Sequence, residues 1–418
     1  MQQRLAWAVT VADSDGRPLL QTDLFGPIDT PTYGCNIPPR SPDLAVGLYQ
    51  KYHFMGTLAL CSLGLDDWDY HSGASAHSAT AKAARERMRN FILPICLNAT
   101  TFYFEHYNPT GPDGKQDMFP SQGEETWQCP GPHNRTQCTT NPASDIAGLW
   151  AVTDRLIHLD HPLNGVGGGD PMLTAAQAEM LVALRQVIPN LPVGVRLNTS
   201  GYSKFAPSTP DRVYLPALSV PSEGAQNSEN IELHAVFPFR LTHLNRTLMD
   251  LAVARATYTH RMFPCTANTI WCEDGNVAAL LGLTEQARAA VLAAVSSALL
   301  KTSPGWRFPL WHAGGGDTTP TMMPQSILRQ TLHSMLLQHT PKGDLLLFPA
   351  WPQGWDVSFK LHAPKGTVVQ GRCVNGTVKG LLVAPASRAA DVRVLGCEKN
   401  VTAARAAWFA AADAAAGS

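Results

Sequence analysis

Residues 227–241 read NSENIELHAVFPFRL, a run in which polar side chains stand directly before a short apolar segment. We expect Phe237 and Phe239 to anchor this segment in a core. The hydrogen-bond donors are Asn230, His234 and Arg240, and the acceptors are Glu229 and Glu232. Such a mixture suits the wall of a sugar-binding site, because donors and acceptors to hydroxyl groups stand side by side. The plain alternative is a helix end whose polar residues are solvated.

Helical periodicity dominates the chain on both sides of this stretch. Upstream, apolar residues recur at helical spacing from about residue 81 to 93, just before Pro94, and from 144 to 160, where Ser144 is a candidate N-cap. Thr174 and Gln177 have the spacing of a capping box and open a helix that ends before Pro189. Downstream, the pattern predicts helices at 244–260, 275–281, 284–300 and 325–338.

After Pro341 the pattern changes to short β-type runs punctuated by Gly, Pro and Asn. These runs are DLLLF, DVSFKL, TVVQGRCV, TVKGLLVA and DVRVLGC. They predict a small antiparallel β-sandwich at 341–400, followed by an alanine-rich tail at 401–418. Residues 1–79 show weak periodicity and are expected to form an irregular N-terminal region.

The composition predicts a folded globular chain. Of its 418 residues, 44% are hydrophobic and 16% are charged, which is ample for a large buried core. A net charge of -1 and the lack of a sustained Lys/Arg run exclude strong attraction to nucleic acid or to anionic membranes. No apolar run reaches the roughly 18 residues of a spanning helix, so we expect no membrane span.

Sequons and cysteines favour the secretory pathway. Six Asn-X-Ser/Thr sequons begin at Asn98, Asn134, Asn198, Asn245, Asn375 and Asn400. Among nine cysteines, the plausible disulfides are Cys129 with Cys138, Cys265 with Cys272, and Cys373 with Cys397. We therefore expect a secreted or lumenal protein of an extracellular, vacuolar or lysosomal compartment. Residues 5–12, LAWAVTVA, are at the short limit of a signal peptide.

The stretch NSENIELHAVFPFRL resembles the ENPELYAVFPFRL segment of uncharacterised secreted six-hairpin glycosidases, relatives of the inverting α-L-fucosidases of glycoside hydrolase family 95. Three further stretches resemble theirs in the same order: EETWQC at 124–129 with TNPASDIAGL at 140–149, IWCEDGNVAALLGLTEQAR at 270–288, and LLLFPAWPQGWDVSFKLHAP at 345–364. The resemblance implies a mainly α fold, in which an (α/α)6 toroid at 80–340, incomplete at its N-terminal side, precedes the β-sandwich.

The resemblance also implies a pair of catalytic carboxyl groups. In an inverting glycosidase one protonates the leaving oxygen, and the other activates a water on the opposite face of the sugar. Glu125 matches the glutamate of the relatives' LETW stretch and is the expected general acid, with Trp127 as an apolar neighbour that desolvates it. The alternative is a surface glutamate beside Glu124.

The expected general base is less well matched. Where the relatives read approximately NYDWTPDQDHG, this chain reads GGDTTPTMMP at 315–324. Asp317 keeps its place, but Met323 falls where the relatives carry an aspartate, and methionine cannot accept a proton from water. Asp317 is therefore the candidate base, and a scaffold that binds sugar without cleaving it is the alternative.

Further residues are expected to position or bind the substrate. Asp274 matches the aspartate of the relatives' GWTQD helix start, although a carboxylate there also favours the helix dipole. Indole faces suit pyranose rings, although tryptophans are as often core residues. The candidate stacking residues are Trp127, Trp271 and Trp311.

Competing kinds of site are weakly supported. The two histidines of His158-Leu-Asp-His161 stand at an expected helix end, so we expect no metal. The glycines of 165–169 lack the context of a phosphate-binding loop, and no Gly-X-Ser-X-Gly elbow is present. No cofactor is expected.

The leading hypothesis is a glycoside hydrolase acting on a fucoside-like or galactoside-like glycan, with carbohydrate as its partner. A carbohydrate-binding pseudoenzyme is the main rival. A polysaccharide lyase is the third reading, and it requires a Tyr/His/Arg cluster around a uronic acid.

Overall fold

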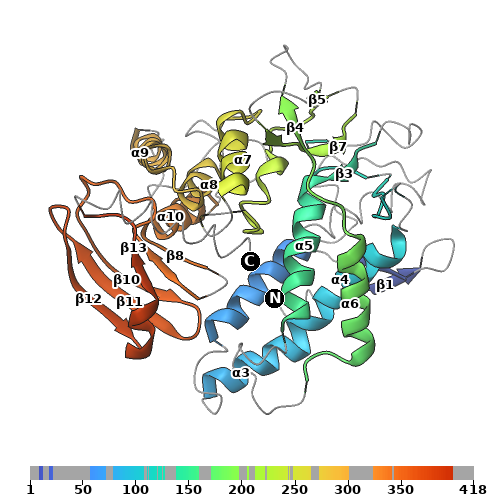
Figure 1. The fold of residues 1–418 in the computed structure, drawn as a ribbon, viewed down its shortest axis with the longest axis horizontal. Coiled ribbons are helices and arrows are strands. Elements are labelled where there is room, and N and C mark those ends of the chain that lie inside the picture. The colour runs from blue at the N-terminus through green and yellow to red at the C-terminus, as the bar shows by residue number, and fades with distance from the viewer. Residues whose placement is uncertain are drawn as a thin grey trace. The chain divides into compact units, whose positions relative to one another are not determined.

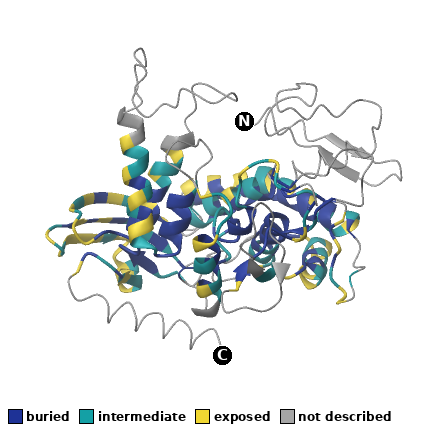
Figure 2. Ribbon diagram, turned by 90° about the horizontal axis from the view of Figure 1, so that it is seen from above, coloured by how far each residue is buried: buried dark blue, intermediate teal, exposed yellow. Residues whose placement is uncertain are grey.

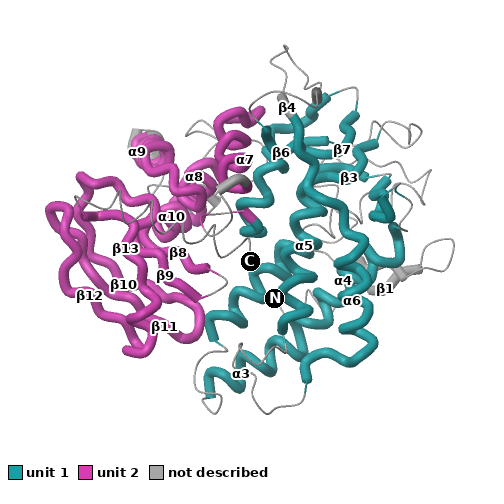
Figure 3. The backbone as a smooth tube through the Cα atoms, in the orientation of Figure 1, with its two compact units in different colours: residues 1–241 teal, residues 242–418 magenta. Residues whose placement is uncertain are grey.

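The computed structural model describes residues 9–12, 18–21, 57–71, 79–107, 111, 113–119, 121–124, 126–127, 138–159, 171–196, 205–206, 212–221, 224–242, 244, 248–264, 273–300, 323–340 and 343–398. These residues belong to two compact units, Met1–Leu241 and Thr242–Ser418 (Figure 3).

Unit 1 is built on a group of helices (Figure 1). A helix at 57–71 precedes α3 (Ala79–Arg87), which runs through a π-helical turn at Met88–Ile92 into α4 (Leu93–His106). The predicted end of this helix before Pro94 is wrong. The helix continues past Pro94, which lies in the first turn of α4, and the preceding π turn, in which the Leu93 N–H bonds to the Met88 carbonyl, accommodates the proline.

Two further helices of unit 1 begin close to their predicted positions. α5 (Ala143–Ile157) follows Pro142, and α6 (Ala175–Val187) begins after Thr174. The capping box is confirmed, because the Thr174 hydroxyl accepts from the Gln177 N–H and the Gln177 side chain accepts from the Thr174 N–H. α5 is buried along most of its length. Figure 2 marks the buried residues of the described elements in dark blue.

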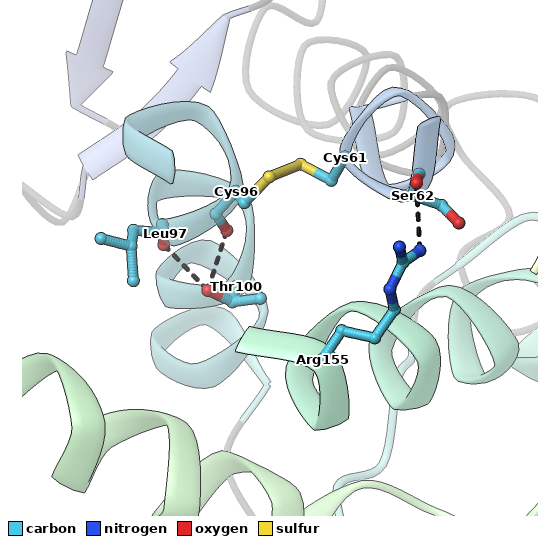
Figure 4. Close-up of a disulfide and its surroundings, with 6 residues drawn as sticks. All are labelled: Cys61, Ser62, Cys96, Leu97, Thr100 and Arg155. Atoms are coloured by element: carbon cyan, nitrogen blue, oxygen red, sulfur yellow. Dashed lines mark hydrogen bonds between the residues drawn. A yellow bond between two sulfur atoms is a disulfide. The ribbon is translucent and has the colours of Figure 1, made fainter. Parts of the chain in front are cut away.

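A disulfide and an arginine fasten helix 57–71 to its neighbours (Figure 4). Cys61 is bonded to Cys96 of α4, a pair that the sequence did not suggest. On the other side, Arg155 of α5 donates to the Ser62 carbonyl at 3.1 Å and pairs with Asp69 at 2.7 Å. The helix is therefore tied covalently to α4 and by charge to α5.

The remaining described part of unit 1 consists of short strands and turns. β1 (Val9–Ala12) pairs with β2 (Pro18–Gln21), and β3 (Thr140–Pro142) pairs with β7 (Ala217–Ser219), both antiparallel. β4 (Val193–Arg196) stands between β5 (Phe205–Ala206) and β6 (Val213–Tyr214). A 3-10 turn, η4 (Ile231–Leu233), lies in the NSENIELHAVFPFRL stretch and packs against α5.

The predicted (α/α)6 toroid is wrong. Six helical hairpins need twelve helices, whereas the described part of the chain contains nine, divided between two units. Between α6 and α7 the described residues form short strands and turns rather than helical hairpins. The cause is local: this interval contains Pro192, Pro207, Pro210, Pro216, Pro221 and Pro238, and proline interrupts helices.

Unit 2 contains the predicted downstream helices. They are α7 (Leu248–Thr259), α8 (Asp274–Leu280), α9 (Thr284–Leu300) and α10 (Met323–Leu336). α8 packs against both α9 and α10, and its described residues are buried throughout. Arg255 of α7 donates twice to the Leu281 carbonyl, at 3.0 and 2.7 Å, and so caps the end of α8.

Two three-stranded sheets follow the helices. β10 (Val357–Ala363), β11 (Thr367–Cys373) and β12 (Val378–Ala384) form an antiparallel meander. β8 (Leu337–His339), β9 (Leu345–Leu347) and β13 (Val392–Val394) form the other sheet, and the 3-10 helix η5 (Ala386–Asp391) leads into β13. The meander is antiparallel as expected, whereas β13 pairs with β9 in parallel within the second sheet.

The cysteines of the described residues are partly as expected. The disulfide between Cys373 and Cys397 is confirmed and joins the end of β11 to the residues after β13. Cys138 is disulfide-bonded. Its predicted partner Cys129 and the predicted pair Cys265 and Cys272 lie outside the described residues. In the part of the chain that the structure describes, every helix is too short or too polar to cross a bilayer.

Candidate functional site

The EETW turn and the NSENIELHAVFPFRL stretch meet in unit 1. Gly123 and Trp127 exchange two backbone hydrogen bonds of 3.0 Å, which hold these two positions side by side. On one side, Thr139 donates its backbone N–H to the Ser121 carbonyl and its hydroxyl to the Trp127 carbonyl, both at 2.9 Å. On the other side, Gln226 donates its N–H to the Thr126 carbonyl at 2.8 Å. The turn is thus held between two segments distant in sequence.

Glu229 forms the polar centre of this junction. One carboxylate oxygen accepts from the Asn227 amide at 2.8 Å, and the other accepts from the buried Thr126 hydroxyl. The Glu229 backbone N–H donates to the same hydroxyl at 2.9 Å. Because both carboxylate oxygens accept hydrogen bonds from protein groups, Glu229 holds the two segments together.

A second acid of the turn faces an imidazole. Glu124 Oε1 lies 3.2 Å from His234 Nδ1, and the two side chains are 14% and 11% exposed. The separation is an ion-pair distance, but the geometry at Nδ1 does not meet that of an aligned hydrogen bond. Glu124 has a φ of 51°, a left-handed conformation that is rare outside glycine. This pair is the best candidate among the described residues for handling a proton.

Trp127 lies inside the protein rather than on a binding surface. Its side chain is 2% exposed, and a Cβ added at Gly123 would meet both the indole and Ile231. The indole is therefore buried beside Gly123 and offers no face to a sugar ring. The Ile231 side chain of η4 reaches the same glycine, so apolar contact joins the two segments as Glu229 joins them through hydrogen bonds.

Asn230 and Arg240 stand at the two ends of the same segment. Asn230 precedes η4, and its carbonyl accepts the Leu233 N–H at 2.9 Å. Arg240 has a φ of 52°, and its charge acts on Tyr70 of helix 57–71. Burial raises the pKa of Tyr70, and Arg240 partly opposes that shift. Arg240 thus lies near Tyr70, a partner that the sequence did not predict.

The remaining predicted site residue in the described part, Asp274, belongs to unit 2. Arg261 donates to its Oδ2 from Nε at 2.7 Å and lies 2.6 Å from it through Nη2. The same guanidinium donates to the Tyr258 carbonyl at 2.6 Å and lies over the Tyr258 ring at 4.1 Å. Asp274 is also the first residue of α8, where a carboxylate favours the helix dipole. These contacts account for Asp274 as a structural residue.

The other predicted residues fall outside the described part of the chain. These are Glu125, Asp317, Trp271 and Trp311. Met323, which stands where the resemblance expects an aspartate, is the first residue of α10. Among the described residues, no three His, Cys, Asp or Glu side chains gather in a way that could hold a metal ion.

A buried carboxylate in the TNPASDIAGL stretch was missed from the sequence. Asp145 is 1% exposed and accepts from the Tyr103 hydroxyl and from the Ser144 hydroxyl, the latter at 3.3 Å. Asp145 lies in the first turn of α5, where a carboxylate interacts favourably with the helix dipole, and this position could have been inferred from the sequence. Its pairing with Tyr103, on another helix, has no sequence signal.

This cluster predicts a loss of stability in alkali. Burial raises the pKa of Tyr103 well above its ordinary value, and the Asp145 carboxylate raises it further; the same two causes act on Tyr107. The stability is therefore complete below the unfolded-state pKa of about 10 and is lost as the pH rises toward the folded-state value. Each tyrosine should contribute a loss of about 1.4 kcal/mol per pH unit above pH 10.

Urea unfolding at a series of pH values between 8 and about 11.5 measures this loss. Tyr103→Phe should give a shallower decline than the unmodified chain, whatever its stability at pH 8. Identical slopes in the two proteins would show that Tyr103 ionises as readily in the folded state as in the unfolded one.

Comparison with known proteins does not identify the chain by another route. No family model and no curated protein matches this chain, so the resemblance to the six-hairpin glycosidases stands as a hypothesis.

Proposed function

We propose that this chain is a glycoside hydrolase that acts on a glycan or oligosaccharide, with the EETW turn as the source of its general acid. One observation carries the proposal. The sequence predicts that the EETW turn and the NSENIELHAVFPFRL stretch are separate parts of a sugar site, and Thr126 and Glu229, 103 residues apart, are hydrogen-bonded to each other. Acid, amide and imidazole groups are thereby gathered at one junction, as recognition and cleavage of a sugar require.

In this proposal the described residues of the junction have two roles, positioning of the turn and handling of a proton. Glu229, Asn227 and Thr126 position the turn. Glu124 and His234 form an acid and imidazole pair beside it, which suits the transfer or orientation of a proton. In the proposed reaction, Glu125 protonates the leaving oxygen and Asp317 activates water, with inversion at the anomeric carbon. A secreted or lumenal location is part of the proposal, and the disulfides support it.

Carbohydrate binding without cleavage is the second candidate. It is favoured by Met323, which begins α10 where the resemblance expects the catalytic aspartate. It is also favoured by Glu229, whose two oxygens are both engaged by protein groups. Under this reading the junction retains its hydrogen-bonding groups and turnover is lost.

The test is release of sugar from a panel of aryl glycosides and oligosaccharides that includes fucosides and galactosides. Glu125→Gln should lower kcat by about 10²–10⁴-fold, the usual worth of a general acid. Glu124→Gln is the neighbouring comparison, and Glu179→Gln, at an exposed position of α6, is the matched control. NMR of the first product should show an inverted anomer.

Three results would contradict the proposal in different ways. If Glu125→Gln keeps full activity and Glu124→Gln loses it, the general acid is Glu124 rather than Glu125. Glycan binding without product after long incubation would establish the pseudoenzyme. Products that absorb in the ultraviolet would indicate a lyase.

A further inference from the structure

Two of the six sequons begin in the described residues, and the structure presents them differently. Asn375-Gly-Thr occupies the connection between β11 and β12, whereas Asn98-Ala-Thr lies within α4. Both asparagine side chains are exposed. The difference lies in the backbone and in the hydroxyl residue two positions later.

Asn375 stands at the tip of a tight hairpin. Val374 and Thr377 exchange two backbone hydrogen bonds, of 3.0 and 3.1 Å, so that only Asn375 and Gly376 form the loop. Their φ values are 52° and 68°, as a type I′ turn requires, and Asn-Gly is the favoured pair for that turn. The tip is therefore a defined turn that projects beyond the last paired residues of the sheet.

The backbone of the hairpin tip is held in place, whereas the side-chain groups of the sequon are exposed. The Asn375 backbone N–H donates to Asp356 Oδ1 at 2.8 Å, and Cys373, just before the turn, is bonded to Cys397. Neither the Asn375 amide group nor the exposed Thr377 hydroxyl makes a side-chain hydrogen bond within the described ranges. Both groups of the sequon are thus available to an enzyme after the sheet has folded.

The sequon of α4 is presented in the opposite way. Thr100 is 0% exposed, and its hydroxyl donates to the carbonyl groups of Cys96 and Leu97 at 2.9 and 3.0 Å. The helical backbone and the engaged hydroxyl remove this sequon from recognition once α4 has formed.

We propose that Asn375 is a site of N-linked glycosylation when the chain passes through the secretory pathway. The Asn375 amide nitrogen attacks the anomeric carbon of an oligosaccharide carried on a lipid diphosphate. The new N–C bond replaces the bond between sugar and diphosphate, the amide proton passes to a base of the transferase, and the lipid diphosphate leaves. The inference rests on the secretory location proposed above and is independent of glycosidase activity.

A glycan at this tip has a physical role in the fold. β12 is one of the two edge strands of its sheet, and its Leu381 and Leu382 are 36% and 63% exposed. Exposed apolar edge strands are templates for pairing with other chains. Lys379 is the one charged residue of β12, and a bulky hydrophilic group at the adjoining turn would shield the edge further.

The site is tested by expressing the chain behind a host signal peptide, so that entry into the secretory pathway is imposed. Enzymatic removal of glycans in heavy-oxygen water marks each formerly occupied asparagine, and peptide mass spectrometry then reads the marks. We expect high occupancy at Asn375, higher than at Asn98. Thr377→Ala should abolish it with Asn375 intact, Thr377→Ser should retain it, and Asn98→Gln should leave it unchanged.

A secreted chain with unmodified Asn375 would overturn the site, whether or not other sequons are occupied. The shielding role has its own readout, because deglycosylated protein should self-associate more strongly in light scattering. Leu382→Lys should suppress that association. Equal scattering before and after deglycosylation would remove the shielding role and leave the modification site in place.

Discussion

Replacing Asp274 by alanine should lower the free energy of unfolding of unit 2 by about 3–5 kcal/mol, because the change leaves a largely buried guanidinium without its carboxylate. The Asp274 and Arg261 side chains are 8% and 15% exposed, so water replaces little of the lost interaction. The Tyr258 carbonyl and ring keep Arg261 in place and prevent it from turning to solvent. The buried charge therefore stays where its partner was.

The measurement is urea unfolding, compared with Glu285→Ala in α9. Glu285 is 74% exposed and lies 3.7 Å from Arg288, so its removal should change stability by no more than about 0.5 kcal/mol. The double variant Asp274→Leu with Arg261→Met removes both charges and should recover most of the loss. A stable Asp274→Ala protein that no longer releases sugar would instead assign Asp274 to the chemistry.

The second large effect is expected for Trp127→Ala, at about 3–5 kcal/mol. The indole is one of the largest fully buried side chains and lies, like the Ile231 side chain, against Gly123 of the EETW turn. Its removal leaves a cavity beneath the turn that the backbone hydrogen bonds of Gly123 keep from closing. The loss should appear in the unfolding of unit 1.

Phe119→Ala is the matched control, because Phe119 is 39% exposed and should cost much less. Trp127→Phe should retain most of the stability, since it keeps an aromatic ring in the same space. If Trp127→Ala has the same free energy of unfolding as the unmodified chain but no longer binds glycan, the indole contacts the sugar and the packing role assigned to it is wrong.

Local features of the fold were predictable, because neighbouring residues determine them. Thr174 and Gln177 form the capping box that their spacing predicts, and the strands β9 to β13 fall on the runs that alternation and turn residues marked. The toroid was not predicted from local sequence patterns. It came from a resemblance, and the proline-rich interval between α6 and α7 argued against it.

Long-range pairings could not be predicted. Cys61 and Cys96 lie on two helices and are 35 residues apart, so no loop pattern joins them. Tyr103 and Asp145 meet for the same reason, through the packing of α4 and α5. The Glu124 carboxylate meets His234, 110 residues further along the chain, through a backbone in the left-handed region that the sequence does not signal.

The bond between Cys61 and Cys96 has a consequence for how the chain survives cleavage. A protease that cuts once anywhere between these positions produces two pieces that remain covalently joined. On an electrophoresis gel the nicked molecule should run as one band until a thiol reagent separates it. Because the disulfide keeps helix 57–71 close to α4 and to Arg155 after cleavage, the nicked protein should lose less stability than it would if the fragment could diffuse away.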